Sequence, residues 1–367
     1  MDKMVNDKDF YNGKRVFVTG HTGFKGSWLC RILIGWGAEV TGYSLAPPTQ
    51  PNLFSMAAIE GHMTSVIGDI RDFENLKKVF DEARPEIVFH LAAQPIVRDS
   101  YKSPRFTYET NVMGTVNLME CVRLAKAKVM SVVNITTDKV YQNNEWVWGY
   151  RENELLDGFD PYSNSKSCSE LVTHCYKNSF FEGEEKPRVS TARAGNVIGG
   201  GDFANDRIIP DCVRSMLQGK VIEVRNPNSI RPYQHVLEPL FAYIFIAHAQ
   251  WENINFSDWY NVGPDETDCV TTGQLVDIFC HAWGTGANWE DCSKEGALHE
   301  ANFLKLDCSK IKNKLGWHPV WNINDAVAKT VEWTRVWTAE ENVPAEMDRQ
   351  IALYEEKKHE NSICNRG

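Results

Sequence analysis

The chain has 367 residues, of which 43% are hydrophobic, and carries a formal net charge of -10 at neutral pH. A chain of this length and composition can bury a full core in one large or two modest domains, so we expect a folded globular protein. The acidic balance argues against a nucleic-acid-binding protein, because sequence-independent binding needs a basic surface that displaces counterions. Local Arg and Lys residues must therefore meet any anionic ligand.

No apolar run approaches the roughly 18 residues that span a bilayer, and no secretory signal is recognisable. We therefore expect a soluble, cytoplasmic protein that does not bind membranes. The ten cysteines are scattered from Cys30 to Cys364 without a C-x-x-C pair or metal-ligand spacing. Since free cysteine behaves as a small hydrophobic residue, we interpret most of them as reduced and buried, and we expect no metal site.

The first half of the chain alternates predicted strands with predicted helices. In chain order these are strand 14–19, helix 28–36, strand 39–43, strand 65–68, helix 73–83, strand 87–91, helix 110–125 and strand 129–135. Strands that alternate with helices are joined by right-handed crossovers and form a parallel sheet covered on both faces. The sequence therefore predicts an α/β fold with a Rossmann-type doubly wound parallel sheet.

The composition changes after about Ala194, where Gly and Pro become denser and strand-like segments shorten. We predict a smaller, discontinuous C-terminal substrate domain there, because two later segments look like a helix and a strand that return to the first domain. The expected division is a cofactor domain at 1–194 with returns at about 236–263, a substrate domain at 195–235 and 264–354, and a frayed tail at 355–367.

A glycine-rich turn, Gly20-His21-Thr22-Gly23-Phe24-Lys25-Gly26, joins the first strand to the first helix. In this context the backbone can approach a pyrophosphate, and the amides at the helix N-terminus point at its negative charge. The spacing differs from the common dinucleotide fingerprint, so taken alone it fits a merely tight turn equally well. His21 and Lys25 are expected either to contact phosphates or to be solvated loop residues.

Residues at the ends of later strands extend the predicted dinucleotide site. Asp69 could accept a hydrogen bond from adenine or could cap a helix. No acidic residue follows the second strand, where many NAD-binding folds hold the adenosine ribose, and no arginine replaces it for a 2′-phosphate, so NAD is favoured over NADP. The expected cofactor contacts are Gly20, His21, Thr22, Gly23, Phe24, Lys25, Gly26, Tyr43, Asp69, Ile70, Leu91, Ala92, Ala93, Gln94, Asn111, Thr136, Tyr162 and Lys166.

Tyr162 and Lys166 are four residues apart, which places both on one face of a helix. A tyrosine beside a fixed positive charge has a lowered pKa, so it can take a proton from an alcohol while hydride leaves the same carbon. Thr137, Asp138 and Lys139 follow the fifth strand directly, at the edge where such folds hold their ligands. We predict that these five residues are catalytic; the alternatives are a surface helix and a polar turn.

Together the glycine turn, the Thr-Thr-Asp motif and Tyr-x-x-x-Lys resemble the extended branch of the short-chain dehydrogenase/reductase superfamily. Four longer segments are similar, more narrowly, to the CDP-glucose 4,6-dehydratase family: TGHTGFKGSW at 19–28, WGYRENE at 148–154, RAGNVIGGGD at 193–202 and RPYQHVLEP at 231–239. The likeness covers nearly the whole chain. It implies an NAD-dependent enzyme of deoxysugar and lipopolysaccharide biosynthesis that acts on CDP-glucose. It also implies a homodimer or homotetramer, whose helices 110–125 and 162–178 would pair across a two-fold axis.

The resemblance implies that NAD takes hydride from sugar carbon 4, water is lost across carbons 5 and 6, and hydride returns to carbon 6. Tyr162 would be the base for the 4-hydroxyl, Lys166 would lower its pKa and hold the nicotinamide ribose, and Thr137 would hydrogen-bond the 4-oxygen. Asp138 would protonate the departing 6-hydroxyl, which requires burial to raise its pKa. Lys139 would act as the base at carbon 5 or steady the enolate electrostatically.

Arg207 and Arg231 are the candidates for the substrate diphosphate, because a guanidinium offers two donors to phosphate oxygens. Asn196 would hydrogen-bond the phosphate or the sugar. Gln94 and Asn111 are weaker candidates, since they could simply satisfy backbone groups.

Two other functions fit the same scaffold. A nucleotide-sugar 4-epimerase needs the Tyr, Lys and Thr but no acid and base for elimination, so Asp138 and Lys139 favour the dehydratase. An NAD(H)-sensing protein without turnover is a further alternative, because a fold alone never proves activity. The intact Tyr162 and Lys166 argue against it.

Overall fold

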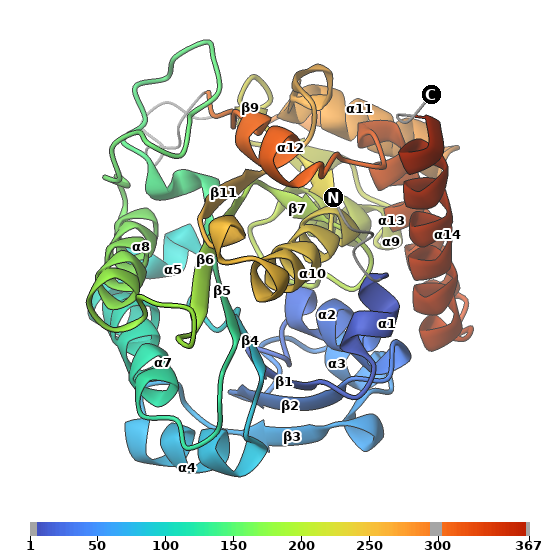
Figure 1. The fold of residues 1–367 in the computed structure, drawn as a ribbon. Coiled ribbons are helices and arrows are strands. Elements are labelled where there is room, and N and C mark those ends of the chain that lie inside the picture. Colours follow the sequence, from blue (N-terminus) through green and yellow to red (C-terminus); the bar gives the residue numbers. More distant parts are fainter. Residues whose placement is uncertain (1–5, 294–302, 365–367) are drawn as a thin grey trace.

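The computed structural model describes residues 6–293 and 303–364 (Figure 1). The strands are β1 (Arg15–Thr19), β2 (Glu39–Ser44), β3 (Thr64–Ile67), β4 (Ile87–His90), β5 (Ser131–Thr137), β6 (Arg188–Ala194), β7 (Val197–Ile198), β8 (Ile222–Val224), β9 (Ile230–Arg231), β10 (Gln234–His235), β11 (Trp259–Val262), β12 (Val270–Thr271) and β13 (Trp289–Asp291).

The α-helices are α1 (Asp7–Tyr11), α2 (Phe24–Gly35), α3 (Leu53–Met56), α4 (Phe73–Ala83), α5 (Val97–Lys102), α6 (Pro104–Tyr108), α7 (Gly114–Arg123), α8 (Pro161–Phe180), α9 (Ile208–Leu217), α10 (Leu237–Glu252), α11 (Thr272–Trp283), α12 (Ser309–Leu315), α13 (Ile323–Thr338) and α14 (Val343–Cys364). The shorter turns are η1 (Glu60–His62), the π-helical η2 (Glu109–Met113), η3 (Asp138–Val140), η4 (Ile254–Phe256) and η5 (Glu266–Asp268). The parts of the predicted domains and tail at 1–5, 294–302 and 365–367 lie outside the described residues.

Seven parallel strands form one sheet in the order β11-β6-β5-β4-β1-β2-β3 (Figure 1). The five strands predicted for the first half of the chain are all present in it. Their β-branched and aromatic residues suit the buried centre of a parallel sheet. The strand order reverses between β1 and β4, and open α/β sheets bind ligands outside the strand ends at such a point. The prediction of a Rossmann-type doubly wound sheet is confirmed.

Helices cover both faces of this sheet. α4, α7 and α8 pack on one face, and α2 and α10 pack on the other (Figure 1). α4 shows why, since Leu76, Val79 and Phe80 recur at helical spacing and pack in one cluster with Phe17 of β1. β5 is buried along its whole length between α8 and α10. The end of β5, where catalytic residues are predicted, is therefore held between two layers of helices.

Residues after β6 build a smaller second region from short paired strands and helices. β7 pairs with β10, β8 with β13 and β9 with β12. Ile209 of α9, Phe279 of α11 and Val327 of α13 belong to a hydrophobic cluster of this region. In between, the chain returns to the large sheet, because α10 packs on β5 and β6 while β11 pairs with β6. The domain boundaries themselves stay a prediction.

The segment predicted to be a frayed tail continues α14 as helix as far as Cys364. Trp36 of α2 donates a hydrogen bond to the Glu355 carboxylate at 2.9 Å, and Lys358 pairs with Asp7 at 3.1 Å. The expectation of a frayed tail is wrong over this described part. Its charged composition suggested solvent exposure, but two of these charged side chains find partners near the other end of the chain.

The cysteines whose side chains the structure describes carry free thiols, and Cys30, Cys121, Cys212 and Cys308 among them are buried. Over residues 6–293 and 303–364, no helix is both long and apolar enough to cross a bilayer. The same residues contain no cluster of three or more His, Cys, Asp or Glu side chains that could hold a metal ion.

Candidate active site

Gly20 and Gly26 bring the chain very close to itself where β1 passes into α2. Gly20 has a φ of +79°, and a Cβ there would lie 2.8 Å from the Ala92 nitrogen. A Cβ on Gly26 would lie 2.1 Å from the Gly20 carbonyl oxygen. Only glycine fits both positions without moving the backbone. The N-terminus of α2 is therefore packed against the ends of β1 and β4.

Gly23 is the N-cap residue directly before α2, and it leaves the first amides of the helix without a side-chain cap. A Cβ on Gly23 would have only the Gly20 carbonyl oxygen within 4 Å, at 3.4 Å, so this face of the turn is open. The first amides of a helix lack partners inside the helix, and the helix dipole favours an anion beside them. The turn thus fits a dinucleotide pyrophosphate held by backbone groups.

The side chains of the turn point into the protein rather than toward this open face. His21 is fully buried, hydrogen-bonds Ser65 at 2.8 Å, and has its pKa lowered to about 4 by burial, so its ring is neutral near pH 7. Thr22 donates to the Leu45 carbonyl at 2.8 Å. The alternative in which His21 is a solvated loop residue is wrong, because its ring is buried, while a cofactor contact at His21 stays a prediction.

Lys25 extends toward α10, where its ammonium donates to the Tyr243 hydroxyl at 3.0 Å. Burial, together with the charges of Lys166 and Arg207, lowers the pKa of Lys25 to about 7, while the charge of Asp138 opposes this shift. The side chain therefore lies among the predicted catalytic residues, and it is not the solvated loop residue of the second alternative. Its expected contact with a cofactor phosphate stays a prediction.

The side chains at the ends of β2 and β3 form hydrogen bonds and an ion pair with neighbouring residues. Tyr43 is fully buried, donates to the Asp69 carbonyl at 3.1 Å and accepts from Asn75 at 3.1 Å. The Asp69 carboxylate binds the Arg71 guanidinium, with its shortest contact at 2.6 Å, and this pair lowers the pKa of Asp69. The alternative role of Asp69 as a helix cap is wrong, because Asp72 caps α4. An adenine contact through Asp69, and contacts through Tyr43, stay predictions.

Gln94 and Asn111 support the loop after β4. The Asn111 side chain accepts from the Gln94 amide at 2.8 Å and donates to its carbonyl at 3.1 Å and to Ser165 at 2.8 Å. The Gln94 side chain forms two hydrogen bonds with the Ile96 backbone. The structure thus shows the alternative in which both amides satisfy backbone groups. Leu91, Ala92 and Ala93 precede them, half-buried, and Ile70 packs against the start of α7.

Tyr162 and Lys166 lie in the first turns of α8, where Asp160 caps the helix by accepting from the Ser163 amide at 3.0 Å. Both side chains are buried, and the Lys166 ammonium donates to the Ile135 carbonyl of β5 at 3.1 Å. Burial raises the pKa of Tyr162 to about 12 despite a hydrogen bond with Thr137. The pKa of Tyr162 is thus raised rather than lowered, because desolvation of the phenol dominates, and the expected effect of Lys166 on this pKa stays a prediction.

Thr137, Asp138 and Lys139 form a connected group at the end of β5. The Thr137 hydroxyl donates to Asp138 Oδ1 at 2.9 Å, and the Lys139 ammonium donates to the same oxygen at 3.2 Å. Asp138 is fully buried, and its second oxygen, Oδ2, has no hydrogen-bond partner among the residues that the structure describes. Lys139 also donates to the Asn196 side chain at 3.2 Å. The structure thus brings a buried carboxyl group with one free oxygen beside Tyr162.

Of the predicted substrate residues, Asn196 joins this group through Lys139. Arg207 precedes α9 and pairs with Asp202 at 2.8 Å, and the charges of Asp202 and Tyr162 raise its pKa. It therefore faces the catalytic residues from the second region. Arg231 lies on β9, buried, and donates to the Ile230 carbonyl at 2.8 Å.

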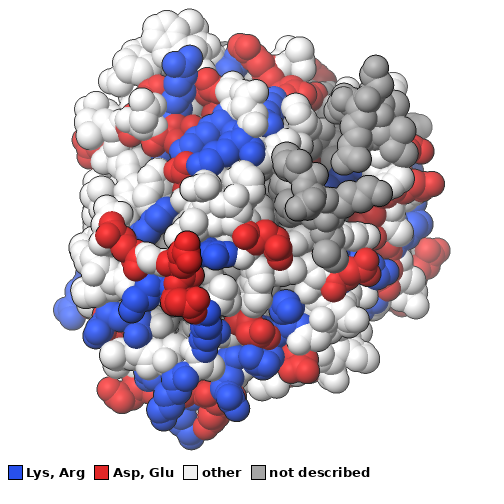
Figure 2. Space-filling model, in the orientation of Figure 1, with Lys and Arg blue, Asp and Glu red and all other residues white. Residues whose placement is uncertain are grey.

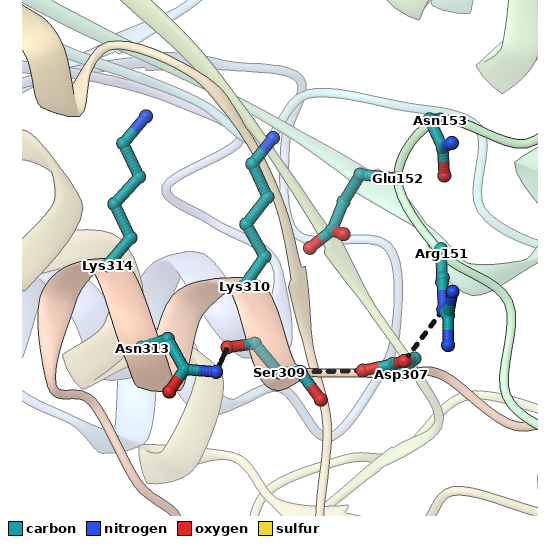
Figure 3. Close-up of a pocket in the computed structure, with 8 residues that line it drawn as sticks. All are labelled: Arg151, Glu152, Asn153, Asp307, Ser309, Lys310, Asn313 and Lys314. Carbon is teal, nitrogen blue, oxygen red and sulfur yellow. Dashed lines mark hydrogen bonds and ion pairs between the residues drawn. The ribbon is translucent and has the colours of Figure 1, made fainter.

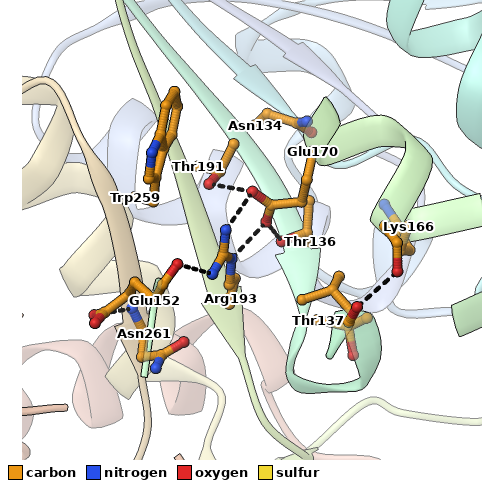
Figure 4. Close-up of polar contacts among 12 residues, drawn as sticks. Asn134, Thr136, Thr137, Glu152, Lys166, Glu170, Thr191, Arg193, Trp259 and Asn261 are labelled. Atoms are coloured by element: carbon orange, nitrogen blue, oxygen red, sulfur yellow. Dashed lines mark hydrogen bonds and ion pairs between the residues drawn. The ribbon is translucent and has the colours of Figure 1, made fainter. Parts of the chain in front are cut away.

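One buried ion pair near the site is not predicted by the sequence. Glu170 of α8 accepts two hydrogen bonds from the Arg193 guanidinium of β6, each at 3.0 Å, and both side chains are fully buried (Figure 4). Thr136 also donates to the Glu170 carboxylate. The cofactor contact of Thr136 stays a prediction, and it would have to involve the backbone, since the Thr136 hydroxyl faces α8. A signal was present, because Glu170 continues the four-residue spacing of Tyr162 and Lys166.

A separate cavity of about 640 Å³ lies between the loop after β5 and α12 (Figure 3). It is lined by Arg151, Glu152, Asn153, Asp307, Ser309, Lys310, Asn313 and Lys314. Its cations are neutralised nearby: Arg151 pairs with Asp307, and both lysines pair with Asp258. The same mixing of signs extends over the face seen in Figure 2, where acidic side chains border the basic clusters. The predicted catalytic residues do not line this cavity.

Comparisons with known proteins agree with this geometry. The family model described as GDP-mannose 4,6 dehydratase matches residues 17–330. The chain is 51% identical over 353 residues to the CDP-glucose 4,6-dehydratase of Salmonella typhimurium, a match that covers 95% of this chain and 98% of that protein.

Two solved structures share the fold. The UDP-glucose 4-epimerase of Thermotoga maritima with UDP-glucose has a TM-score of 0.76 at 24% identity, covering 88% of this chain and 99% of that one. The dTDP-glucose 4,6-dehydratase of Bacillus anthracis in complex with NAD has a TM-score of 0.73 at 23% identity, covering 90% and 99%. Because the family model spans most of its length and the Salmonella relative is so similar, the chain belongs to the GDP-mannose 4,6 dehydratase family.

Proposed function

We propose that the protein is a CDP-glucose 4,6-dehydratase, a hydro-lyase of deoxysugar biosynthesis that uses NAD and converts CDP-D-glucose to CDP-4-dehydro-6-deoxy-D-glucose and water. The 51% identity to the Salmonella enzyme over 95% of the chain supports the reaction and the substrate. One observation in the structure carries the dehydratase function: the buried Asp138, with a free oxygen, lies beside Thr137 and the Tyr162–Lys166 pair. Asp138 thus adds an acid to Thr137, Tyr162 and Lys166, the residues proposed to oxidise an alcohol.

The residues of the turn and the start of α8 fit NAD. The open face at Gly23 and the uncapped amides of α2 would hold the pyrophosphate, and Lys166 would hold the nicotinamide ribose. When bound, NAD accepts hydride from sugar carbon 4 and later returns it to carbon 6. The neutral, buried His21 leaves this work to the backbone of the turn.

Tyr162 takes the proton of the sugar 4-hydroxyl, and Thr137 donates a hydrogen bond to the 4-oxygen. Both groups are buried, so the reacting oxygen is shielded from water. Because burial raises the pKa of Tyr162 to about 12, the phenol needs a neighbouring positive charge to give up its proton at neutral pH. The charged Lys166, on the same face of α8, would supply it once ligands complete the site.

Asp138 protonates the departing 6-hydroxyl through its free oxygen. Lys139 has two acceptors within reach, Asp138 and Asn196, and an ammonium group suits both of them. We therefore assign Lys139 two successive roles: as its neutral amine it takes the carbon-5 proton, and the ammonium so formed, held by Asp138 and Asn196, stabilises the enolate while Asp138 gives its proton to the 6-hydroxyl and water leaves. Arg207 and Arg231 hold the substrate diphosphate from the second region.

The first test follows the mass of the product after incubation with CDP-glucose and NAD. Loss of one water supports dehydration, whereas unchanged mass with inversion at carbon 4 would indicate an epimerase, and no turnover would indicate a sensor. Parallel reactions with dTDP-, GDP- and UDP-glucose test the base. Asp138→Asn should still oxidise the sugar but fail to release water, so reduced cofactor should accumulate. A variant that still dehydrates would contradict the role of Asp138.

We further propose that two copies pair through the outer faces of α7 and α8, where Leu124, Leu171 and Phe180 are large hydrophobic side chains exposed in the single chain. Light scattering on the purified protein gives the mass, and Leu171→Glu should halve the mass of a dimer built in this way. We also propose a cytoplasmic location. Free thiols at the described cysteines suit a reducing compartment.

A further inference from the structure

The Glu170 carboxylate lies at the centre of the interface that α8 forms with β5 and β6 (Figure 4). Its side chain is fully buried. Glu170 follows Lys166 by four residues and Tyr162 by eight, so all three lie along one side of α8. The helix that carries the catalytic pair therefore also carries a charge into the protein interior.

Both carboxylate oxygens of Glu170 are fully used. Oε1 accepts from the Thr136 hydroxyl and from Arg193 Nε at 3.0 Å. Oε2 accepts from the Thr191 hydroxyl at 2.7 Å and from Arg193 Nη2 at 3.0 Å. His174 of the same helix lies 3.4 Å from Oε2. One carboxylate thus ties α8 to both neighbouring strands.

The other side of the Arg193 guanidinium continues the network. Nη1 donates to the Tyr141 hydroxyl at 2.8 Å and to the Glu152 carbonyl at 3.0 Å. Burial raises the pKa of Glu170, but Arg193 and the hydrogen bonds outweigh it and hold that pKa well below its usual range. Glu170 and Arg193 therefore form a charged pair inside the protein.

Stability alone is a poor explanation for such a pair. Replacing a buried ion pair by well-packed hydrophobic residues is often neutral or stabilising, because desolvation of the charges offsets their attraction. Buried strands of parallel sheets are usually continuous apolar runs. Here four polar side chains of two adjacent strands face α8 instead: Asn134, Thr136, Thr191 and Arg193.

The hydrogen-bond network around Glu170 lies directly beside the proposed catalytic residues. Thr136 directly precedes Thr137 on β5, and Asp138 follows. Tyr162 and Lys166 lie on the helix that carries Glu170. The two halves of the catalytic group thus come from separate elements, and the Thr136–Glu170 hydrogen bond joins those elements next to the site.

We propose that Glu170, clamped by Arg193, is a positioning residue that sets α8 against the end of β5 and so aligns Tyr162 and Lys166 with Thr137 and Asp138. The proposal rests on the proposed function for the identity of the reaction, but the alignment itself applies to any chemistry at this site. The Thr136 hydroxyl is the link to the catalytic strand, and the Thr191 hydroxyl is the link to the neighbouring strand.

The two threonines give a matched pair of variants. Thr136→Val and Thr191→Val each remove one hydroxyl donor to the same carboxylate and keep the shape of the side chain. We expect Thr136→Val to lower kcat by roughly tenfold with KM for CDP-glucose nearly unchanged, since small misplacements of reacting groups are costly. Thr191→Val should keep kcat within about twofold. Thr136→Ser, which restores the hydroxyl, should recover most of the lost kcat.

Hydrogen exchange gives a readout that does not require turnover. Thr136→Val should speed amide exchange at both the end of β5 and the start of α8, whereas Thr191→Val should leave the start of α8 unchanged. Equal losses of kcat, or equal rates of amide exchange at the start of α8, in the two Val variants would show that Glu170 has only a structural role. Either result would overturn the proposal. If the wild type turned over no nucleotide sugar, the proposed function would fail, while the exchange experiment would still decide the positioning role.

Discussion

The cofactor side and the catalytic side of the site are built in opposite ways. At the glycine turn the side chains of His21, Thr22 and Lys25 point into the protein, and the backbone is left to face the ligand. At the end of β5 and the start of α8 the backbone groups form the hydrogen bonds of the strand and the helix. Side chains such as Asp138 and Tyr162 form the proposed site there. The first side depends on close approach of the chain to itself, and the second depends on placed polar groups.

This difference predicts different mutational behaviour. A variant on the catalytic side should lose rate and keep its fold. A variant at the glycines should lose cofactor affinity and stability together, because the same close packing serves both.

The largest effect is expected from Tyr162→Phe, which removes the group that takes the proton. We expect kcat to fall by about 10²–10⁴-fold, the usual contribution of a positioned acid or base. The melting temperature should change little, since the ring still fills its buried position. Steady-state kinetics and thermal melts check this. A variant within tenfold of the wild type would exclude Tyr162 as the base.

The glycines supply the next largest effect. A Cβ on Gly26 would lie 2.1 Å from the Gly20 carbonyl oxygen, so Gly26→Ala must displace the backbone and should cost about 1–3 kcal/mol of stability and most of the NAD affinity. Gly23→Ala meets that oxygen only at 3.4 Å and should fold normally while binding NAD more weakly. Calorimetry of binding and unfolding compares the two. Equal stability of both variants would contradict the steric argument.

A smaller effect should appear in the pH dependence of the reaction. Burial lowers the pKa of Lys166 to about 8, and Glu170 partly offsets this. Lys166 is therefore mostly charged at pH 7 and mostly neutral at pH 9, so kcat/KM should decline as the pH rises through 8. Lys166→Arg should move this decline to higher pH. Lys25→Met removes the other buried lysine nearby and should leave the decline in place; if the decline disappears, Lys25 is its source.

The smallest effect is expected from a buried carboxyl group outside the site, whose pKa is also shifted by burial. Glu238 of α10 accepts from the Val320 and Trp321 amides and from Tyr354, and burial raises its pKa to about 7. A raised pKa means that the folded state binds the proton more tightly, so this contribution is full below about pH 4.5 and is lost as the pH rises through 7.

Glu238→Gln cannot titrate, so its free energy of unfolding should vary less between pH 5 and 8 than that of the wild type, by on the order of 1 kcal/mol. Urea unfolding at several pH values measures this. Identical pH profiles for the two proteins would show that Glu238 keeps its ordinary pKa in the folded state.

Much of the fold was predictable because its signals are local. Runs such as 87–89 are β-branched or aromatic throughout, and α4 matches its predicted range because its apolar residues have helical spacing. The grouping of the proposed catalytic residues was predictable for a related reason. Tyr162 and Lys166 share one helix face by spacing alone, and Thr137 and Asp138 follow a strand whose end must reach the ligand edge.

The remaining features depend on contacts that sequence spacing does not encode. The inward direction of His21 depends on Ser65, which comes from a different strand. Glu170 looked like an ordinary helix residue because its partner, Arg193, lies on another element. The charged segment after Tyr354 suggested a free tail because two of its partners, Trp36 and Asp7, lie more than 300 residues away in sequence.

The contacts between α14 and α2 have a consequence for folding during synthesis. Asp348 binds Arg31, and Glu355 binds Trp36, so the last helix of the described chain braces the helix that begins at the glycine turn. Domains often fold from the N-terminus during synthesis. Here the contacts of α2 with Asp348 and Glu355 cannot form until those residues have left the ribosome. A stalled or truncated chain would therefore possess the turn but lack the support behind it.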